Sequence, residues 1–254
     1  MDKYLKKAEM TGLLDVIKDW IKGEKYVSVS RIQREFSVGF NTATSVFNYL
    51  VEQNLVEEDP TYSKGHRVIQ YNPLAPMDIY LVDVNDKIVD ALKKEFKPFG
   101  EVKVIKDDFA HFMETHKDVE CIVSPANAFG YMDGGYDKAI ADYFGKEVEQ
   151  EVQRFIDKHL FGEQPVGSSI MVDISNTNKK LIHTPTMRLP SPIKDPFVIY
   201  QCMRTTLMVA FKAKVSSIVI PSFGGATGKV KPKVIATYMR LGYEQILNYI
   251  KEKN

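Results

Sequence analysis

Two glycine-rich segments in this sequence each follow an apolar run and precede a stretch with helical spacing. The first contains Gly134 and Gly135, and the second contains Gly224, Gly225 and Gly228. Glycines at the start of a helix let backbone N–H groups approach an anion, and the helix dipole favours negative charge there. Either segment alone is typical of an ordinary tight turn. The two together predict a site that holds two phosphates, one at each segment.

The sequence lacks two common nucleotide-binding motifs. The segment GGATGK is followed by Val230, so it lacks the Ser or Thr that ends a Walker motif. The run MDIYLVDV is not followed by GxGxxG, which excludes a Rossmann dinucleotide fingerprint. Neither Cys121 nor Cys202 lies in a CxxC motif, so a cysteine-built zinc site is not expected, and the sequence predicts no metal and no cofactor.

The glycine segments must be positioned by a sheet. Apolar, β-rich runs cover 77–84, 101–105, 119–124, 168–174, 180–187 and 215–222, and helical spacing covers 86–98, 135–159, 196–213 and 231–251. Such alternation predicts an α/β fold, with a mixed, mostly parallel sheet covered on both faces. Ligands of these sheets bind beyond the carboxyl ends of the strands, so we expect the site in the loops after Ser124 and Ser222.

The first 71 residues have a different pattern. Apolar spacing predicts three helices, the first over 5–21, followed by a hairpin, which is the order of a winged helix-turn-helix. Ser28 or Ser30 is expected to cap the second helix and Asn41 the third. Residues 72–76, NPLAP, contain two prolines and are interpreted as a linker between domains at 1–71 and 77–254.

The composition excludes several classes of protein. Lys+Arg 34 against Asp+Glu 33 gives a net charge of +1, so any nucleic-acid binding must depend on a local patch. No apolar run approaches the ~18 residues that a membrane span needs, so no membrane partner is expected. The start, MDKYLKKAEM, has no apolar stretch after its charges, which argues against a secretory signal and for the cytoplasm.

The stretch VSVSRIQREFSVGFNTATSVFNYLVEQNLVEE resembles the gamma domain of FtsK-type DNA translocases. It keeps Ile32-Gln33-Arg34, Phe36, Gly39-Phe40-Asn41 and Leu50 of that pattern. The resemblance implies a third helix that reads the major groove of DNA. The residues expected to face DNA are Arg31, Arg34, Asn41, Thr42, Thr44, Ser45, Lys64 and Arg67.

The charge of this domain leaves a second interpretation open. Residues 1–75 hold ten Lys or Arg and ten Asp or Glu, and the third helix lacks the arginines that the family carries after the Asn. Phosphate neutralisation dominates protein–DNA affinity, so we expect weak DNA binding by a single chain. The alternative is a dimerisation or docking module.

The second domain resembles a macro domain, the family that binds ADP-ribose, over essentially all of 77–254. Five segments carry the resemblance in order: KDDFAHF with Asp108-Phe109, SPAN at 124–127, DGGYD at 133–137, LIH at 181–183 and PSFGGATG at 221–228. The resemblance implies a three-layer α/β/α fold. It also implies ADP-ribose or an ADP-ribosylated substrate as the partner.

The resemblance also assigns roles within the site. Asp108 would accept a hydrogen bond from the adenine amino group, Phe109 would lie beside the ring, and Asn127 would bind the distal ribose. The two glycine segments would each hold one phosphate. The ligand-binding residues that it implies are Asp108, Phe109, Ala126, Asn127, Gly134, Gly135, Tyr136, Ser222, Gly224, Gly225, Ala226, Thr227 and Gly228.

Hydrolysis is a separate expectation. In hydrolytic macro domains an Asn and an Asp position a water near the anomeric carbon of the ribose, and this chain has Asn127 and Asp137, ten residues apart. The chain departs from the family at Ser124, where an Asn is usual, at Asp133, where a glycine is usual, and at Lys229, where many members have an aromatic residue. We therefore expect an ADP-ribosyl hydrolase with Asn127 and Asp137 as catalytic residues. The alternative is a non-catalytic sensor of ADP-ribose or a nucleotide that regulates DNA or partner binding.

Overall fold

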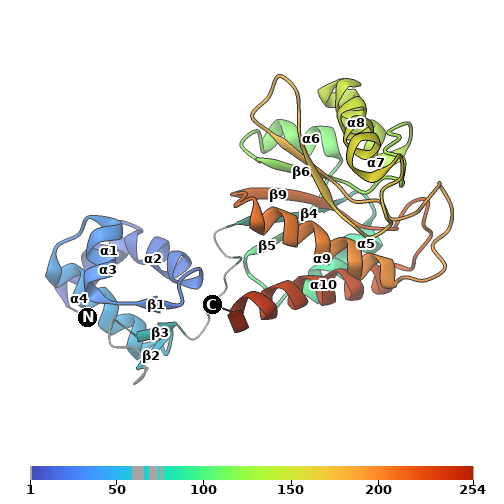
Figure 1. The fold of residues 1–254 in the computed structure, drawn as a ribbon. Coiled ribbons are helices and arrows are strands. Elements are labelled where there is room, and N and C mark those ends of the chain that lie inside the picture. Colours follow the sequence, from blue (N-terminus) through green and yellow to red (C-terminus); the bar gives the residue numbers. More distant parts are fainter. Residues whose placement is uncertain (1, 59–65, 69–73, 75–76, 254) are drawn as a thin grey trace. The chain divides into compact units, whose positions relative to one another are not determined.

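The computed structural model describes residues 2–58, 66–68, 74 and 77–253. The chain divides into two compact units, residues 77–246 and residues 1–76 with 247–254 (Figure 1). The expected linker, 72–76, lies outside the described residues except for Leu74.

Up to Leu74, the described residues of the first unit form four helices and a small antiparallel sheet. Its elements in chain order are α1 (Lys3–Met10), α2 (Leu13–Lys22), β1 (Tyr26–Val27), α3 (Val29–Phe36), α4 (Phe40–Glu52), β2 (Val56–Glu58) and β3 (His66–Val68). The strands pair in the order β1-β3-β2. Buried side chains from α2, α3 and α4, including Ile17, Ile32 and Leu50, form its core.

Two details of this unit differ from the sequence prediction. The first helix is broken into α1 and α2, because Gly12 takes a left-handed conformation with φ 71°. Ser28 caps α3 as expected, accepting from the Arg31 N–H. However, Asn41 does not cap α4. Gly39 is the N-cap residue, and the Asn41 side chain donates to the Tyr4 hydroxyl instead.

The second unit contains the alternating strands and helices that the sequence predicts. Its elements are β4 (Asp78–Asp83), α5 (Asp86–Phe96), β5 (Val102–Lys106), α6 (Phe109–Thr115), β6 (Cys121–Ser124), α7 (Gly135–Phe144), α8 (Glu147–Leu160), β7 (Ile170–Asp173), β8 (Lys180–His183), α9 (Phe197–Lys212), β9 (Ser217–Pro221) and the part of α10 (Pro232–Lys253) that ends at residue 246. The stretch 135–159 forms two helices instead of one, because Gly145 interrupts it with φ 96°.

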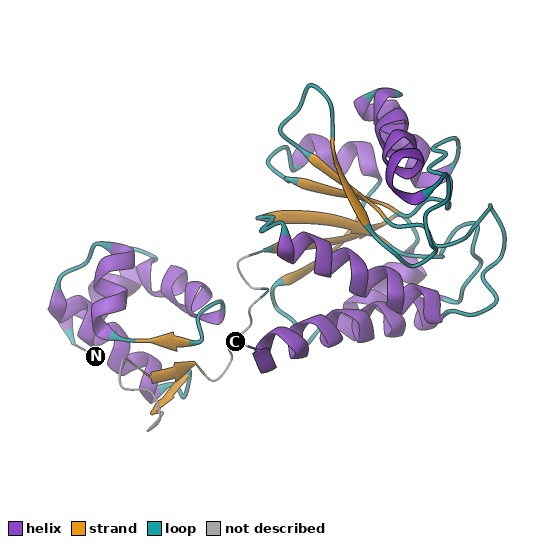
Figure 2. Ribbon diagram, in the orientation of Figure 1, coloured by secondary structure: helices purple, strands orange, loops and turns teal. Residues whose placement is uncertain are grey.

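The large sheet, whose strands are orange in Figure 2, has the strand order β5-β4-β9-β6-β8-β7. All neighbours pair in parallel except β7, which runs antiparallel to β8. The sheet is therefore mixed, as expected. Because β9 lies between β4 and β6, the loops after all three strands meet at one edge of the sheet.

Helices cover both faces of this sheet. In Figure 1, α6, α7 and α8 lie on one face, and α5, α9 and α10 lie on the other. On the first face, buried side chains such as Phe112, Ile122 and Val219 form a continuous apolar cluster. The fold is thus a sheet between two helical layers, which fixes the strand ends that carry the loops. No helix among the described residues is long and apolar enough to cross a membrane.

Candidate functional site

A cavity of about 580 Å³ opens at the carboxyl ends of β4, β5, β6 and β9. Every residue expected from the sequence to bind a ligand or to act on it lines this cavity. These residues are Asp108, Phe109, Ala126, Asn127, Gly134, Gly135, Tyr136, Asp137, Ser222, Gly224, Gly225, Ala226, Thr227 and Gly228. The fold thus brings both glycine segments to one space, although about ninety residues separate them in the sequence.

The loop after β6 is held by the Asn127 side chain. Its Nδ2 donates to the Tyr131 carbonyl at 2.9 Å, and its Oδ1 accepts from the Phe129 N–H at 3.1 Å and the Tyr131 N–H at 3.4 Å. Asn127 is only 6% exposed. The amide therefore shapes the loop in this structure, although it lies at the cavity wall.

The helix that follows this loop starts at the cavity. Gly134, in extended backbone, is the N-cap residue of α7, and no side chain caps the helix. Gly135 has φ 59°, a conformation that favours glycine. A Cβ atom at Gly134 would meet nothing within 4 Å, so the cavity reaches this backbone. The first N–H groups of α7 are thus placed to meet an anion.

Asp137 lies in the first turn of α7, where it is partly buried. The Ser124 hydroxyl, at the end of β6, donates to its Oδ1 at 2.7 Å. Burial raises the pKa of the Asp137 carboxyl to about 7, the negative charge of Asp133 adds to this rise, and the hydrogen bond from Ser124 opposes it. Asp137 can therefore exchange a proton near neutral pH.

The loop after β9 is a compact glycine turn. Gly224 has φ 80°, and its carbonyl accepts from the Val230 N–H at 3.1 Å. A Cβ atom at Gly228 would lie 2.7 Å from the Gly224 carbonyl oxygen and 2.7 Å from the Ile193 side chain. Glycine is therefore needed at 228 for the turn to close.

An aspartate at the end of β4 contacts this second loop. The Ser222 hydroxyl donates to Asp83 Oδ2, and Asp83 Oδ1 accepts from the Asn85 N–H at 2.7 Å. Asp83 therefore connects the end of β4 to the first residue after β9.

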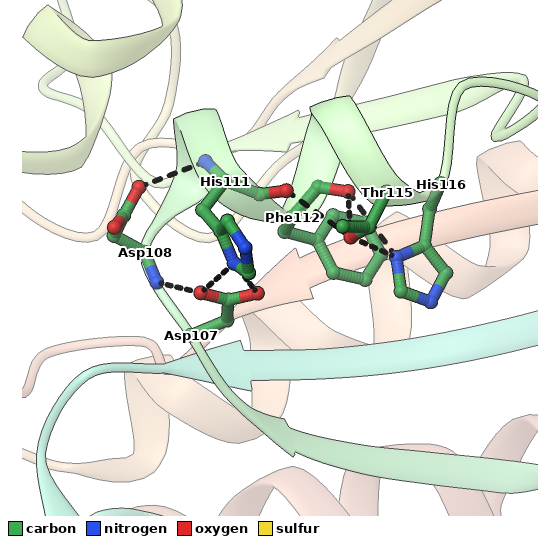
Figure 3. A network of polar contacts seen from close by, with 6 residues as sticks. All are labelled: Asp107, Asp108, His111, Phe112, Thr115 and His116. Atoms are coloured by element: carbon green, nitrogen blue, oxygen red, sulfur yellow. Dashed lines mark hydrogen bonds and ion pairs between the residues drawn. The ribbon is translucent and has the colours of Figure 1, made fainter.

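A polar network surrounds Asp108 (Figure 3). Asp108 is the N-cap residue of α6, and its Oδ1 accepts from the His111 N–H at 3.0 Å. The neighbouring Asp107 accepts from the Asp108 N–H at 2.9 Å and lies 2.8 Å from His111 Nδ1 through each of its oxygens. These bonds to Asp107 raise the pKa of His111. The network fixes the backbone from which Asp108 faces the cavity.

The charges of the cavity wall have one sign. Five aspartates line it, namely Asp83, Asp107, Asp108, Asp133 and Asp137, and the described residues contribute no Lys, Arg or His to the wall. The described residues also contain no group of three or more His, Cys, Asp or Glu that could hold a metal ion. An anionic ligand here must therefore be held by neutral donors, namely backbone N–H groups, helix dipoles and side chains such as Thr227.

Several cavity residues were missed by the sequence analysis, namely Asp83, Tyr131, Thr186, Met187 and Pro190. Asp83 ends β4, so the rule on carboxyl strand ends could have identified it. Met187 ends the β-rich run 180–187, and Pro190 lies in the segment that follows this run. Ile193 of the same segment donates its N–H to the Gly228 carbonyl at 3.0 Å, which packs the segment against the second loop.

Two groups that could be reactive, the His183 imidazole and the Cys121 thiol, are buried in strands of the sheet. His183 is fully buried in β8, its Nδ1 contacts Gln164 Oε1 at 2.7 Å, and burial lowers its pKa to about 3. Burial raises the pKa of the Cys121 thiol. Arg188, which directly follows the run 180–187, forms an ion pair in which its Nε lies 2.8 Å from Glu163 Oε1.

In the first unit, the structure gives some residues expected to face DNA a role inside the protein. Arg31 pairs with Glu24, donates to the Tyr26 carbonyl at 3.2 Å and lies over the Trp20 ring. Ser45 is buried, and its hydroxyl donates to the Asn41 carbonyl at 2.9 Å within α4. The Arg31 side chain is thus held by contacts within the unit while it stays 41% exposed, whereas the Ser45 hydroxyl is turned into α4.

The remaining DNA candidates fall into three groups. The Thr44 hydroxyl is buried and has no hydrogen-bond partner among the described residues. Arg34 is exposed and Thr42 is partly exposed. Lys64 lies outside the described residues, and Arg67 lies in β3 with its side chain not described.

The comparison with known protein families found a match within the second unit. Residues 123–239 match the family model of the macro domain. An uncharacterized protein of Aquifex aeolicus (strain VF5) is 31% identical over 140 residues, which are 55% of this chain and 78% of that protein. The chain belongs to the macro domain family. The matched part of the macro domain includes both glycine segments and Asp137, whereas Asp83 and Asp108 precede it.

Solved macro domains resemble the chain more distantly. A macro domain of Oceanobacillus iheyensis with MES bound is 25% identical with a TM-score of 0.46, over 52% of this chain and 71% of that one. The macro domain of Mycobacterium tuberculosis DarG is 18% identical with a TM-score of 0.44, over 51% of this chain and 84% of that one. Both TM-scores are below 0.5, so the family assignment rests on the family model and the Aquifex relative.

Proposed function

We propose that the macro domain binds ADP-ribose in the 580 Å³ cavity, with one phosphate at each glycine segment. The observation that carries this proposal is the meeting of the two segments at one edge of the sheet. The start of α7 offers uncapped N–H groups to one phosphate, and the turn from Gly224 to Gly228 offers its backbone to the other. Asp108 lines the same space and is exposed there to an adenine ring, while Phe109, which is only 2% exposed, supports the wall behind it.

Because the charged side chains described at the wall are acidic, the affinity for ADP-ribose depends strongly on backbone donors. A diphosphate close to five aspartates meets unfavourable charge, which the backbone amides, helix dipoles and neutral side-chain donors of the site must offset. Hydrogen bonds to a charged group contribute roughly 1.5–3 kcal/mol each. Three or four of them, less the entropy of association, support a dissociation constant in the micromolar range.

Calorimetric titration with ADP-ribose tests this proposal through Gly134→Glu. Gly134 has extended backbone and open space at its Cβ position, so the variant should fold, while its carboxylate occupies the region of the α7 N-terminus. We expect micromolar binding by the wild-type protein and a loss of at least about thirtyfold in the variant. Gly100→Glu is the matched control, because Gly100 also has open space and lies outside the cavity. Equal affinities for all three proteins would contradict the proposal.

We further propose that the macro domain hydrolyses a bond between ADP-ribose and a modified group. Asp137 favours this function, since a carboxyl with a pKa of about 7 at the cavity wall can take a proton from water. The alternative is a sensor without turnover. Release of ADP-ribose from modified substrates by the wild type but not by Asp137→Asn supports hydrolysis. Tight binding without release from any linkage supports the sensor.

For the first unit we propose a winged helix-turn-helix that binds DNA weakly. Its element order and the sequence around α3 and α4 support this, and Arg34 is exposed. A docking or dimerisation role is the alternative. It is favoured by two apolar side chains on α4, Phe40 and Val51, which are 62% and 38% exposed.

A further inference from the structure

Asn127 and Asp137 have different surroundings in this structure. The resemblance to hydrolytic macro domains assigns the positioning of water to both. However, both the nitrogen and the oxygen of the Asn127 amide are engaged by the backbone of its own loop. Asp137, by contrast, accepts from a single side-chain hydroxyl across the base of that loop.

The residue that provides this hydroxyl is fixed by the sheet. Ser124 is fully buried at the end of β6, opposite His183 of β8, and its carbonyl accepts from the Thr184 N–H at 2.9 Å. Its side chain reaches Asp137 Oδ1 at 2.7 Å, thirteen residues along the chain. A rigid strand therefore holds one oxygen of a carboxylate that belongs to the start of a helix.

We propose that Ser124 is the positioning residue for Asp137, and that Asn127 shapes the loop instead of sharing the work on water. This inference rests on the proposed hydrolysis. The resemblance implies an Asn at this position, and this chain has Ser124, which donates through a hydroxyl instead. With Oδ1 held by Ser124, the second carboxylate oxygen of Asp137 is left to accept a hydrogen bond from water.

In the proposed hydrolysis, one bond forms, one bond breaks and one proton is transferred. The water oxygen forms a bond to the anomeric carbon of the ribose while the bond from that carbon to the modified group breaks. The proton that water loses passes to Asp137 and then to the leaving group. The Ser124 hydroxyl favours the ionised carboxylate, because it donates to the charged form. It therefore keeps more of the base in the form that can accept a proton.

The test compares Ser124→Ala with the wild type by following ADP-ribose release as a function of pH. Loss of the donor should move the midpoint of the acidic limb upward by about one pH unit. We also expect kcat to fall about tenfold with little change in KM, because a misplaced base affects the reaction more than binding. Ser124→Thr retains a hydroxyl and should restore the wild-type midpoint. A midpoint that Ser124→Ala leaves unchanged would overturn the inference.

Ser217→Ala is the matched control. Ser217 is also a buried serine on a neighbouring strand, and its hydroxyl accepts from the Glu120 N–H at 2.9 Å, outside the cavity. This variant should leave the pH midpoint unchanged. A shift as large as that of Ser124→Ala would show that loss of any buried hydroxyl has this effect, and would count against the inference.

A direct titration separates this inference from the proposed function. The pKa of Asp137 can be followed by NMR of a carboxyl-labelled protein, with Asp137→Asn used to assign the signal. If the wild-type protein releases no ADP-ribose from any linkage, the proposed hydrolysis fails. The titration still decides whether Ser124 controls Asp137, since an equal pKa in wild type and Ser124→Ala overturns the inference.

Discussion

At the residue scale, the cavity holds Asp137 in surroundings that oppose its ionisation. Burial and the nearby Asp133 raise the pKa of Asp137 to about 7, above its ordinary value of 3.8. The folded chain therefore binds this proton more tightly than the unfolded chain does. It follows that Asp137 lowers the stability of the fold increasingly as the pH rises from about 4 to 7.

Asp137→Asn should therefore stabilise the protein at high pH. An amide carries no charge at any of these pH values, so the variant does not share the loss of stability that ionisation causes. We expect its melting temperature to exceed that of the wild type at pH 8 by more than it does at pH 5. Thermal unfolding at both pH values measures this difference. A difference that is the same at both would contradict the raised pKa.

At the element scale, each glycine segment places its backbone at the cavity wall. The reason why glycine suits the position differs between the two segments. Gly134 has open space, whereas Gly228 is packed against the Gly224 carbonyl and Ile193. The first glycine is open to a ligand, and the second is required by the turn itself.

Alanine substitutions should separate these two roles. Gly228→Ala forces a Cβ into contacts of 2.7 Å, so we expect a loss of about 1–3 kcal/mol in the free energy of unfolding and weaker binding of ADP-ribose. Gly134→Ala should change stability by less than about 1 kcal/mol, since its Cβ meets no neighbour. Chemical denaturation and calorimetry measure both quantities. Equal stability losses in the two variants would contradict this assignment.

Much of this arrangement could be predicted from the sequence, because glycine segments and apolar strands are local signals. Gly134, Gly135 and the second segment were placed correctly at the cavity wall. The contacts from Ser124 to Asp137 and from Asp83 to Ser222 could not be predicted, because they depend on strand order and register. The break at Gly145 was missed since the apolar spacing continues through it.

At the scale of the whole molecule, the chain combines a macro domain with a unit of balanced charge. Residues 1–75 contain equal numbers of acidic and basic side chains, and Arg31 is engaged by Glu24. DNA binding would therefore rest on few phosphate contacts, of which Arg34 is the exposed candidate on α3.

Fluorescence anisotropy of the full chain with duplex DNA tests this at several salt concentrations. We expect weak binding, with a slope of log K against log salt of only about −1 to −3, and a shallower slope for Arg34→Ala. Arg154→Ala is the matched control, because Arg154 is exposed on α8 and pairs with Glu151. Binding that responds neither to salt nor to Arg34→Ala would favour the docking role of this unit.

The charged side chains described at the cavity wall are all acidic, which has a consequence for inhibitor chemistry. The proposed diphosphate gains from charge-assisted hydrogen bonds to backbone N–H groups, but the described wall offers it no ammonium or guanidinium group and repels its charge. Analogues in which a neutral, oxygen-rich bridge replaces the pyrophosphate can accept the same N–H groups without repulsion from the five carboxylates. Such uncharged mimics also enter cells more readily, which makes this cavity a favourable starting point for chemical probes.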